Sequence, residues 1–589
     1  MHRAVALRFP VGQRATRQCA DALCATLGER SYDKIVDRRG VVLLLQRDAR
    51  EPAPLILGDD GGLVLGPLFR RGADAGEPIG QLNRDLELSW LCSSGTALVD
   101  HFWGPYLAFL ADRERDRLIV MRDPSGAKPC FAFERAEVRV FATHPSDVLS
   151  SVDVDQVRLA GFLCHPRLSL ARAGVTDVEE VVPGEIWRTG RIEEARVQAW
   201  VPFGRVRPRN SDVIASDIKA AVETAAAAFT SGHSRVLHRL SGGLDSSIVL
   251  AALAAAKRVR GFDLTSINEF SSDVPEGDER VLARLTAGRF QTELVEIAFT
   301  PRPLAEAQAP SAWSPTPGFM ALNTGALSFI ESMSAHSGAL LTSGQGGDHV
   351  FQRNRTLHLG SDAARRGQLS FDLAMALARM SGVSVWKLMW RAGRHAMPFG
   401  RLREAAYVAP ASIANQDLAV QAIGEHFQHP WLEGWRRASP GEVLRALHVL
   451  EATHYHAPSV LHEAFTPAPI LVSQPVMEAC LSAPTYVMAP GVERGLVRMA
   501  YAEDLPPEVL SRTTKGETTR FFVSQLEAQW PALREMLLGG LLIQQAAAEP
   551  ARIESLLAAN RVPDLAASAD IMTCVAAELW LRSLPLQCA

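Results

Sequence analysis

The residues with the clearest chemical potential form a loop in the middle of the chain, Ser241-Gly-Gly-Leu-Asp-Ser-Ser247. The apolar segment 235–240 before it predicts a buried strand that ends at Leu240, and the Ala-rich segment after it predicts a helix to about Ala256. The first amides of a helix have no internal partners, and the helix dipole favours negative charge beside them. The glycines let the backbone approach phosphate oxygens, and the serine hydroxyls add donors. This loop therefore predicts a phosphate-binding site.

A second loop of the same kind, Ser343-Gly-Gln-Gly-Gly-Asp348, follows the apolar segment 339–342. It places Asp348 after a strand and a glycine turn, just as Asp245 is placed by the first loop. Carboxylates beside phosphates require a cation between them, and two carboxylates on facing loops suit a magnesium–pyrophosphate group. We therefore expect Asp245 and Asp348 to hold Mg2+. The alternative for Asp348 taken alone is a tight turn with a solvated side chain.

Ser-Gly-Gly-Leu-Asp-Ser-Ser resembles the pyrophosphate loop of the ATP pyrophosphatases, which cleave ATP between its α and β phosphates; the Walker pattern is absent. The succession of strands and helices over 235–297 resembles that of the asparagine synthetases. By that resemblance the cofactors are ATP and Mg2+, and the backbone around Leu240 and Ile267 holds the adenine at the carboxyl ends of adjacent strands. The residues expected to bind the nucleotide are Leu240, Ser241, Gly242, Gly243, Asp245, Ser246, Ser247, Ile267, Ser343 and Gly344.

The same resemblance implies three catalytic positions. Gln345 stands where asparagine synthetases have Glu and β-lactam synthetases have Tyr; it can orient a substrate but cannot take a proton at neutral pH. The acceptor amine must then lose its proton elsewhere, and His349 is one candidate, although a lone histidine is more often structural. The segment 495–515 resembles the last unit of the family, in which a lysine, here Lys515, stabilises charge on the α-phosphate and the tetrahedral intermediate. Arg512 stands three residues before this lysine instead of the usual two.

The first 205 residues contain short alternating strands and resemble the glutaminase domain of asparagine synthetases. The resemblance rests on a strand ending at Asp112, on Arg122-Asp-Pro-Ser-Gly-Ala-Lys-Pro129 and on Phe141-Ala-Thr143. In that family the nucleophile is a cysteine made N-terminal by removal of the first methionine. Residue 2 is His2 here, and the first cysteine, Cys19, lies in an expected helix. We therefore expect a glutaminase-like domain without glutaminase activity that packs on the second domain.

The expected fold class is α/β with two domains. Residues 1–205 should form a degenerate glutaminase-like αββα sandwich of the Ntn type, and residues 206–589 an asparagine synthetase-like ATP-pyrophosphatase domain. The second domain should contain a doubly wound parallel sheet, followed by helices from residue 352 onward. One polar cluster in the helical part suggests either a substrate wall or a metal site, but its spacing fits no helical metal motif. We expect ordinary helix polar groups at its members, His454, Tyr455, His456, His462 and Glu463.

Composition argues against several classes of function. The net charge of −4 over 589 residues gives no hint of a nucleic-acid surface, and no apolar run approaches the ~20 residues of a membrane span. The N-terminus lacks the apolar core of a signal peptide, so a cytoplasmic enzyme is expected. The eight cysteines form no C-x-x-C pair, which favours neither a zinc site nor a disulfide framework.

Together these features suggest one reaction. A substrate carboxylate attacks the α-phosphorus of ATP, pyrophosphate leaves, and an amine attacks the acyl-adenylate to give an amide and AMP. The second loop, the stretch Ile470-Leu-Val-Ser-Gln-Pro-Val-Met-Glu-Ala-Cys480 and the chain length resemble the lasso-peptide cyclases. These join the N-terminal amine of a leader-cleaved core peptide to an Asp or Glu side chain. The implied partners are that peptide, a leader peptidase and a leader-binding protein.

Three other functions stay open at this point. A β-lactam synthetase or another small-molecule amide synthetase is the second choice, and an asparagine synthetase that uses free ammonia would share both loops. A catalytically silent peptide-binding scaffold is the alternative from a different class. The retention of Asp245, Asp348 and Lys515 argues against the silent scaffold.

Overall fold

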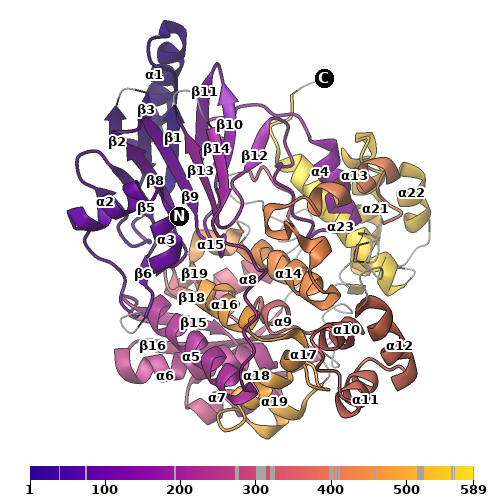
Figure 1. Cartoon of the computed structure of the whole chain (residues 1–589). Helices are drawn as coiled ribbons and strands as arrows, with labels where there is room; N and C mark the ends of the chain where they lie inside the picture. The colour runs from indigo at the N-terminus through magenta and orange to yellow at the C-terminus, as the bar shows by residue number, and fades with distance from the viewer. Residues whose placement is uncertain are drawn as a thin grey trace.

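Two six-stranded antiparallel sheets form the N-terminal part of the computed structural model (Figure 1). The first sheet has the order β12-β10-β11-β1-β3-β2 and the second the order β14-β13-β9-β8-β5-β4. Their strands are β1 (Arg3–Arg8), β2 (Asp33–Arg38), β3 (Val41–Gln46), β4 (Leu55–Leu57), β5 (Gly62–Leu65), β8 (Leu107–Asp112), β9 (Arg117–Arg122), β10 (Phe131–Arg135), β11 (Val138–Ala142), β12 (Val178–Glu180), β13 (Glu185–Thr189) and β14 (Glu194–Gln198). A short ribbon of β6 (Phe69–Arg70) and β7 (Phe102–Trp103) stands apart from both sheets.

Both faces of the two sheets are buried, which explains their continuous apolar runs. In β1, Ala4 and Ala6 join the core between the sheets, whereas Val5 and Leu7 belong to the core on the other face, together with residues of helix α1 (Arg14–Glu29). Helices α2 (Arg84–Cys92) and α3 (Thr96–His101) add buried residues to the same continuous cluster, and Gly95 at the start of α3 lies against Ile119 and Ile186 of the second sheet. The alternation of side chains along a strand produces these two separate layers. The expected αββα sandwich is confirmed.

A five-stranded, fully parallel sheet with the order β17-β16-β15-β18-β19 organises the second part. Its strands are β15 (Arg235–Arg239), β16 (Asp263–Phe270), β17 (Glu293–Ala298), β18 (Leu340–Ser343) and β19 (Thr466–Ala468). The chain adds β16 and β17 on one side of β15, and later β18 and β19 on the other. The strand order therefore reverses between β15 and β18, and ligands of open α/β sheets bind at such a point.

Helices cover both faces of this sheet, as the doubly wound prediction requires. On one face, Val236 of β15 shares a core with α5 (Ser211–Thr230), α6 (Leu244–Arg260) and α7 (Arg280–Phe290). On the other face, Leu237 packs in a smaller core with Phe329 of α8 (Gly325–Ser332) and Leu461 of α15 (Val460–Ala464). The expected domain boundary at residue 205 falls in the connection between β14 and α5.

In the remaining described residues helices predominate, and β19 is a strand among them. These helices are α9 (Gly347–Val350), α10 (His358–Arg365), α11 (Phe371–Met380), α12 (Val385–Ala396), α13 (Gln416–His426), α14 (Pro440–Ala452), α16 (Gln474–Ser482), α17 (Thr485–Met488), α18 (Gly495–Ala500), α19 (Pro507–Ser511), α21 (Trp530–Leu538), α22 (Pro550–Leu557) and α23 (Leu565–Ser583). The expectation of helices alone was wrong at β19, because three residues around Pro467 are too few to show a strand period.

The two parts of the chain pack against each other through several elements. Helix α4 (Gln156–Cys164) of the N-terminal part lies against α13 and α23, as Figure 1 shows. The rings of Trp200 and Trp431 meet with centroids 4.7 Å apart, and the Val152 amide donates to the Pro585 carbonyl at 3.0 Å. Side chains from both parts can therefore line one site.

The structure describes residues 1–587 except 39, 73–75, 191–193, 272–276, 300–312, 319–324, 397–403, 405–406, 409–410, 457–458, 514–522, 525, 559–561 and 563. Within these residues, none of the helices combines the length and the apolar character needed to cross a membrane.

Candidate active site

The two glycine loops meet at the carboxyl ends of the neighbouring strands β15 and β18, where Arg239 pairs with Ser343. Two glycines of the second loop allow this close approach. A Cβ atom on Gly344 would overlap the backbone nitrogen of Ser246, and one on Gly347 would overlap the Asp245 side chain. Both glycines are therefore required by the contact between the loops.

A cavity of about 370 Å³ opens between the loops. It is lined by nearly all of the described residues that the sequence assigned to the site: Leu240, Ser241, Gly242, Gly243, Asp245, Ser246, Ile267, Ser343, Gly344, Gln345, Asp348 and Arg512. Ser247 is the exception, since it is fully buried and its hydroxyl donates to the Gly243 carbonyl at 2.9 Å. This geometry does not support Ser247 as a hydroxyl donor to phosphate.

The amino end of α6 faces this cavity without a side-chain cap, so its first N–H groups are left for a ligand. Ser241 Oγ accepts a hydrogen bond from the Gly243 amide at 3.2 Å and lies 3.1 Å from Ser246 Oγ. Behind the loops, the buried His238 ring contacts Thr342 Oγ1 and the Ser246 carbonyl, each at 2.9 Å. Burial lowers the pKa of His238 to about 4, so at neutral pH an uncharged ring ties both strands to the helix.

Asp245 and Asp348 share one cation. Nη1 of Arg494 lies 2.8 Å from Asp245 Oδ2 and 3.0 Å from Asp348 Oδ1. Arg494 itself adopts a left-handed backbone conformation with φ +57°, which is uncommon for a side-chain-bearing residue. The two carboxylates thus converge on the Arg494 guanidinium.

This donor set fits Mg2+. Magnesium typically takes one or two carboxylates and completes an octahedral shell with water and phosphate oxygens. Asp245 and Asp348 supply the two carboxylates, and the cavity wall supplies the space for a polyphosphate. No group of three or more His, Cys, Asp or Glu side chains among the described residues has metal-binding geometry, so a tighter all-protein site is not found there.

Leu240 and Ile267, expected to contact adenine, both line the cavity but are already hydrogen-bonded. The Leu240 amide donates to the Ile267 carbonyl at 2.7 Å, and the Leu240 carbonyl accepts from Asn268 Nδ2 at 2.7 Å. A purine at this place would therefore rely on apolar contact and on second lone pairs of these carbonyls.

Gln345 is exposed at the cavity wall, where its side-chain oxygen accepts from Ser343 Oγ at 3.3 Å. This place suits contact with a substrate.

His349, one turn further on, points elsewhere. It is 7% exposed, and its Nε2 lies 3.2 Å from Arg167 and 3.5 Å from Glu451. The packing of α9 turns this imidazole away from the nucleotide cavity, which favours the structural interpretation.

Arg512 lines the cavity and forms an ion pair with Glu279, with Nη1 2.7 Å from Oε1. Lys515 lies outside the described residues, so its position relative to the cavity stays a prediction.

The members of the polar cluster in the helical part lie in different surroundings. Tyr455 lines the nucleotide cavity, whereas His454 Nε2 lies 2.8 Å from Ser169 Oγ of the N-terminal part. His462 accepts a hydrogen bond from the Ser459 amide at 3.1 Å, at the start of α15. Burial lowers the pKa of His454 and His456 to about 3 and that of His462 to about 4, so these rings are neutral at pH 7.

Sequence reasoning missed four charged residues that line the cavity: Arg239, Glu269, Glu279 and Arg494. Arg494 bridges the two aspartates, Glu279 pairs with Arg512, and Glu269 pairs with Arg239 at 2.5 Å. Arginine and glutamate are common surface residues in this arginine-rich chain, so their types alone do not mark a site. Arg494 could have been noticed indirectly, because it directly precedes the segment 495–515 that resembles the family.

His2, compared above with the family nucleophile, is engaged on both sides of its ring. Its Nδ1 accepts from the Asp48 amide at 2.8 Å, and its Nε2 contacts the Pro52 carbonyl at 2.9 Å. The residue is 2% exposed, and burial lowers its pKa. With its acceptor nitrogen bound to a backbone amide, this imidazole has no free lone pair for chemistry.

Comparison with known proteins agrees with this site. Residues 217–582 match the family described as asparagine synthase, and the chain belongs to that family. The protein is thus an ATP-dependent synthetase that forms C–N bonds. No curated protein sequence matches the chain.

Two solved structures show weak similarity, each with 11% sequence identity. One is the glutamine phosphoribosylpyrophosphate amidotransferase from B. subtilis, complexed with ADP and GMP. Its alignment covers 52% of this chain and 83% of the amidotransferase chain, with a TM-score of 0.22. The other is an allosteric regulatory enzyme of purine biosynthesis. Its alignment covers 51% of this chain and 76% of that enzyme's chain, with a TM-score of 0.20. At this level of similarity, neither structure indicates what this chain binds.

Proposed function

We propose that the protein is a macrolactam synthetase of the lasso-cyclase type. It activates an Asp or Glu side chain of a leader-cleaved peptide as the acyl-adenylate and joins it to the peptide's own N-terminal amine. One observation carries the proposal: the two ATP loops form an intact cavity, while the residue at the glutaminase position, His2, is buried with its ring engaged. An amine supplied by the substrate replaces ammonia released from glutamine.

In this reaction the chain's own groups mainly position and stabilise charge. The free amides at the start of α6 hold phosphate oxygens, and Asp245 and Asp348 hold the cation that neutralises the leaving pyrophosphate. When bound, Mg2+ would supply that charge neutralisation. Gln345 orients the acyl group or the amine through its amide atoms. Lys515 stabilises the negative charge that develops at the α-phosphate.

The test is AMP formation with the purified protein, ATP, Mg2+ and the leader-free core peptide encoded beside its gene. We expect AMP, pyrophosphate and a peptide product lighter by one water, and no product when the internal Asp or Glu is replaced by Asn or Gln. Turnover of small amino acids instead of the peptide would favour a β-lactam-synthetase-like enzyme. Asparagine formed from aspartate and ammonium would favour an asparagine synthetase. A leader peptidase, a leader-binding protein and a cytoplasmic location belong to the same proposal.

Glutamine is expected neither to be hydrolysed nor to stimulate the reaction. The physical reason is that His2 cannot form a thioester and its ring nitrogens are engaged in hydrogen bonds. The measurement is glutamate release from glutamine, with and without ATP and peptide. Release that thiol alkylation abolishes would show that a cysteine elsewhere serves as the nucleophile.

A further inference from the structure

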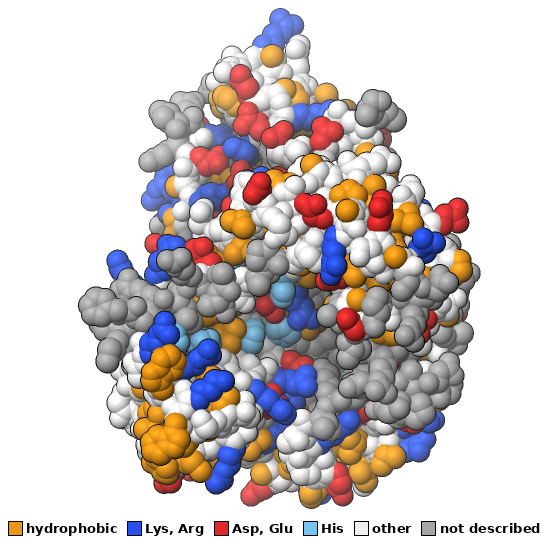
Figure 2. All heavy atoms as spheres, turned by 90° about the vertical axis from the view of Figure 1, so that its right-hand side faces the viewer, with side chains coloured by type: hydrophobic (Ala, Val, Ile, Leu, Met, Phe, Trp, Pro, Cys, Tyr) orange, Lys and Arg blue, Asp and Glu red, His pale blue; other side chains and the backbone are white. Residues whose placement is uncertain are grey.

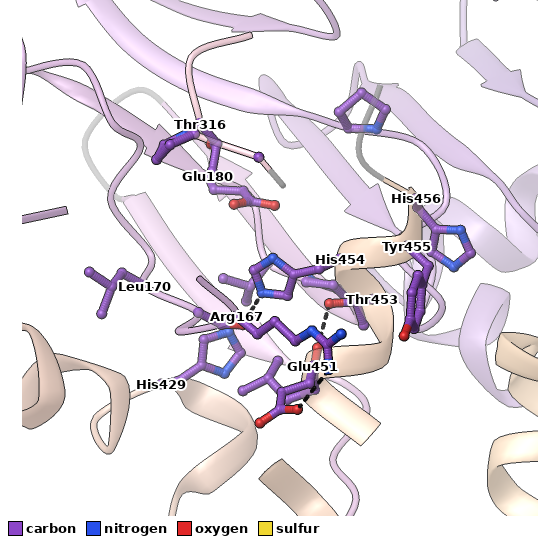
Figure 3. A pocket seen from close by; sticks show the side chains of 18 of the residues that line it. Arg167, Leu170, Glu180, Thr316, His429, Glu451, Thr453, His454, Tyr455 and His456 are labelled. Carbon is purple, nitrogen blue, oxygen red and sulfur yellow. Dashed lines mark hydrogen bonds and ion pairs between the residues drawn. The ribbon is translucent and has the colours of Figure 1, made fainter. Parts of the chain in front are cut away.

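A second cavity, of about 160 Å³, lies beside the nucleotide cavity, between the N-terminal part and the segment after α14. Tyr455 lines both cavities, so one side chain separates them. Figure 3 shows Arg167 and Glu451 pointing toward one another in this space, with His454 and Tyr455 on the short turn that follows α14. In Figure 2, histidine and charged side chains gather in a hollow in the middle of the face.

The charges of this second cavity do not balance. Arg122 pairs with Glu180 at 2.7 Å, and Arg167 pairs with Glu451 at 3.8 Å. Arg158 also lines the cavity and is 2% exposed, but no described carboxylate lies within ion-pair distance of its guanidinium. Its Nη1 donates to the Leu168 carbonyl, and its Nε has no partner among the described residues.

The neighbouring histidines neither add to this positive charge nor offset it. His454 and His456 have pKa values lowered to about 3, and His429 has a pKa lowered well below its usual range, in each case mainly by burial. They are neutral at pH 7 and offer ring nitrogens as hydrogen-bonding groups. His456 Nε2 is itself buried without a partner in the part of the chain that the structure describes. Glu180 and Asp155 act on Arg158 without forming an ion pair with it, so the cavity holds a buried cation that lacks a direct partner, which is costly unless an anion joins it.

We propose that this cavity binds a carboxylate of the ligase substrate, other than the one that is activated, with Arg158 as its anchor. The inference rests on the proposed function, because it takes the substrate to be one that reaches from the nucleotide cavity past Tyr455. Planar guanidinium groups bind carboxylates through paired N–H donors, and the imidazoles complete the polar wall. The volume admits one end of a peptide, not several residues. The N-terminal part would thereby serve substrate binding without any reaction of its own.

The test measures binding of small carboxylates to the whole protein without ATP. N-acetylglycine carries a terminal carboxylate, the α-amide of N-acetylaspartic acid carries only a side-chain carboxylate, and N-acetylglycinamide carries neither. We expect at least one of the two carboxylates to raise the melting temperature, and the neutral amide to raise it little. The carboxylate that binds tighter identifies the part of the substrate that enters the cavity.

Arg158→Met should weaken carboxylate binding at least about tenfold, and Arg158→Lys should restore part of it. Neither change should alter ATP affinity, because Arg158 does not line the nucleotide cavity. Arg188→Met, on β13 and outside both cavities, is the matched control and should bind like the wild type. In turnover assays, Arg158→Met should raise the KM for the peptide more than it lowers kcat.

Three results would overturn the inference. Carboxylates and the neutral amide could bind wild type equally, Arg158→Met could bind carboxylates as tightly as Arg188→Met, or inorganic phosphate could be the better ligand. The wild-type comparison of acid with amide stands even if Arg158→Met does not fold. A protein that binds carboxylates through Arg158 but forms no AMP would refute the proposed function and leave the anion site in place. If the enzyme is active but Arg158→Met leaves its KM for the peptide unchanged, the anion site is refuted and the proposed function stands.

Discussion

Replacement of either Asp245 or Asp348 by Asn is expected to lower ATP-dependent amide formation by on the order of 100-fold. Asp245 contributes two oxygens and Asp348 one to the shared cation position, where they lie 2.9 Å, 2.8 Å and 3.0 Å from Arg494 Nη1. A neutral amide can still accept a hydrogen bond but no longer neutralises the cation that accompanies pyrophosphate. The loss should grow at low Mg2+ concentration, because the site binds the metal less tightly.

The measurement is kcat/KM for AMP formation as a function of Mg2+ concentration. Glu296→Gln, which removes one carboxylate from a surface pair on β17, is the matched control and should be unchanged. Arg494→Met tests the competing explanation that the aspartates only fix Arg494, since it should retain the Mg2+ dependence of the wild type. Full activity in both aspartate variants would refute the assignment of the two loops to pyrophosphate.

The loops themselves could be predicted from the sequence because their signals are local. An apolar run, a glycine turn and an apolar helix are read within about twenty residues, and strand ends are where α/β sheets bind ligands. The expected strand ending at Leu240 is β15, and the helix expected to end at about Ala256 is α6, Leu244–Arg260. Buried helices and strands have strong periodic signals, so these elements were placed to within a few residues.

The cation position between the loops could not be predicted in the same way. Arg494 and Asp245 are 249 residues apart in sequence and meet only through the packing of α18 beside the sheet. The direction of His349 depends on which side of the four-residue helix α9 meets α14. Such contacts are decided by tertiary packing, which leaves no periodic trace in the sequence.

Lys515→Ala is expected to lower kcat by about 100- to 1000-fold and to leave ATP affinity nearly unchanged. The expected partner of the ammonium group is charge that develops at the α-phosphate and at the tetrahedral carbon, so its loss should be felt in the transition state. Arg512 stands three residues before Lys515 in the sequence. Arg512 lines the cavity, and its carbonyl accepts from Arg498 Nη2 at 2.8 Å. Three residues span at most about 11 Å.

The decisive comparison is single-turnover product formation against nucleotide affinity. Lys515→Arg should rescue poorly, because a planar guanidinium does not replace a compact ammonium in a tight site. Lys387→Ala, which removes an exposed lysine from α12, is the matched control and should retain wild-type turnover. Gln345→Ala should instead disturb the position of the acyl group or the amine, and Gln345→Glu should not create ammonia-dependent synthesis. If Lys515→Ala lost nucleotide binding in proportion to rate, the lysine would be a ground-state phosphate ligand, and the stabilisation of the tetrahedral intermediate would have to come from another residue.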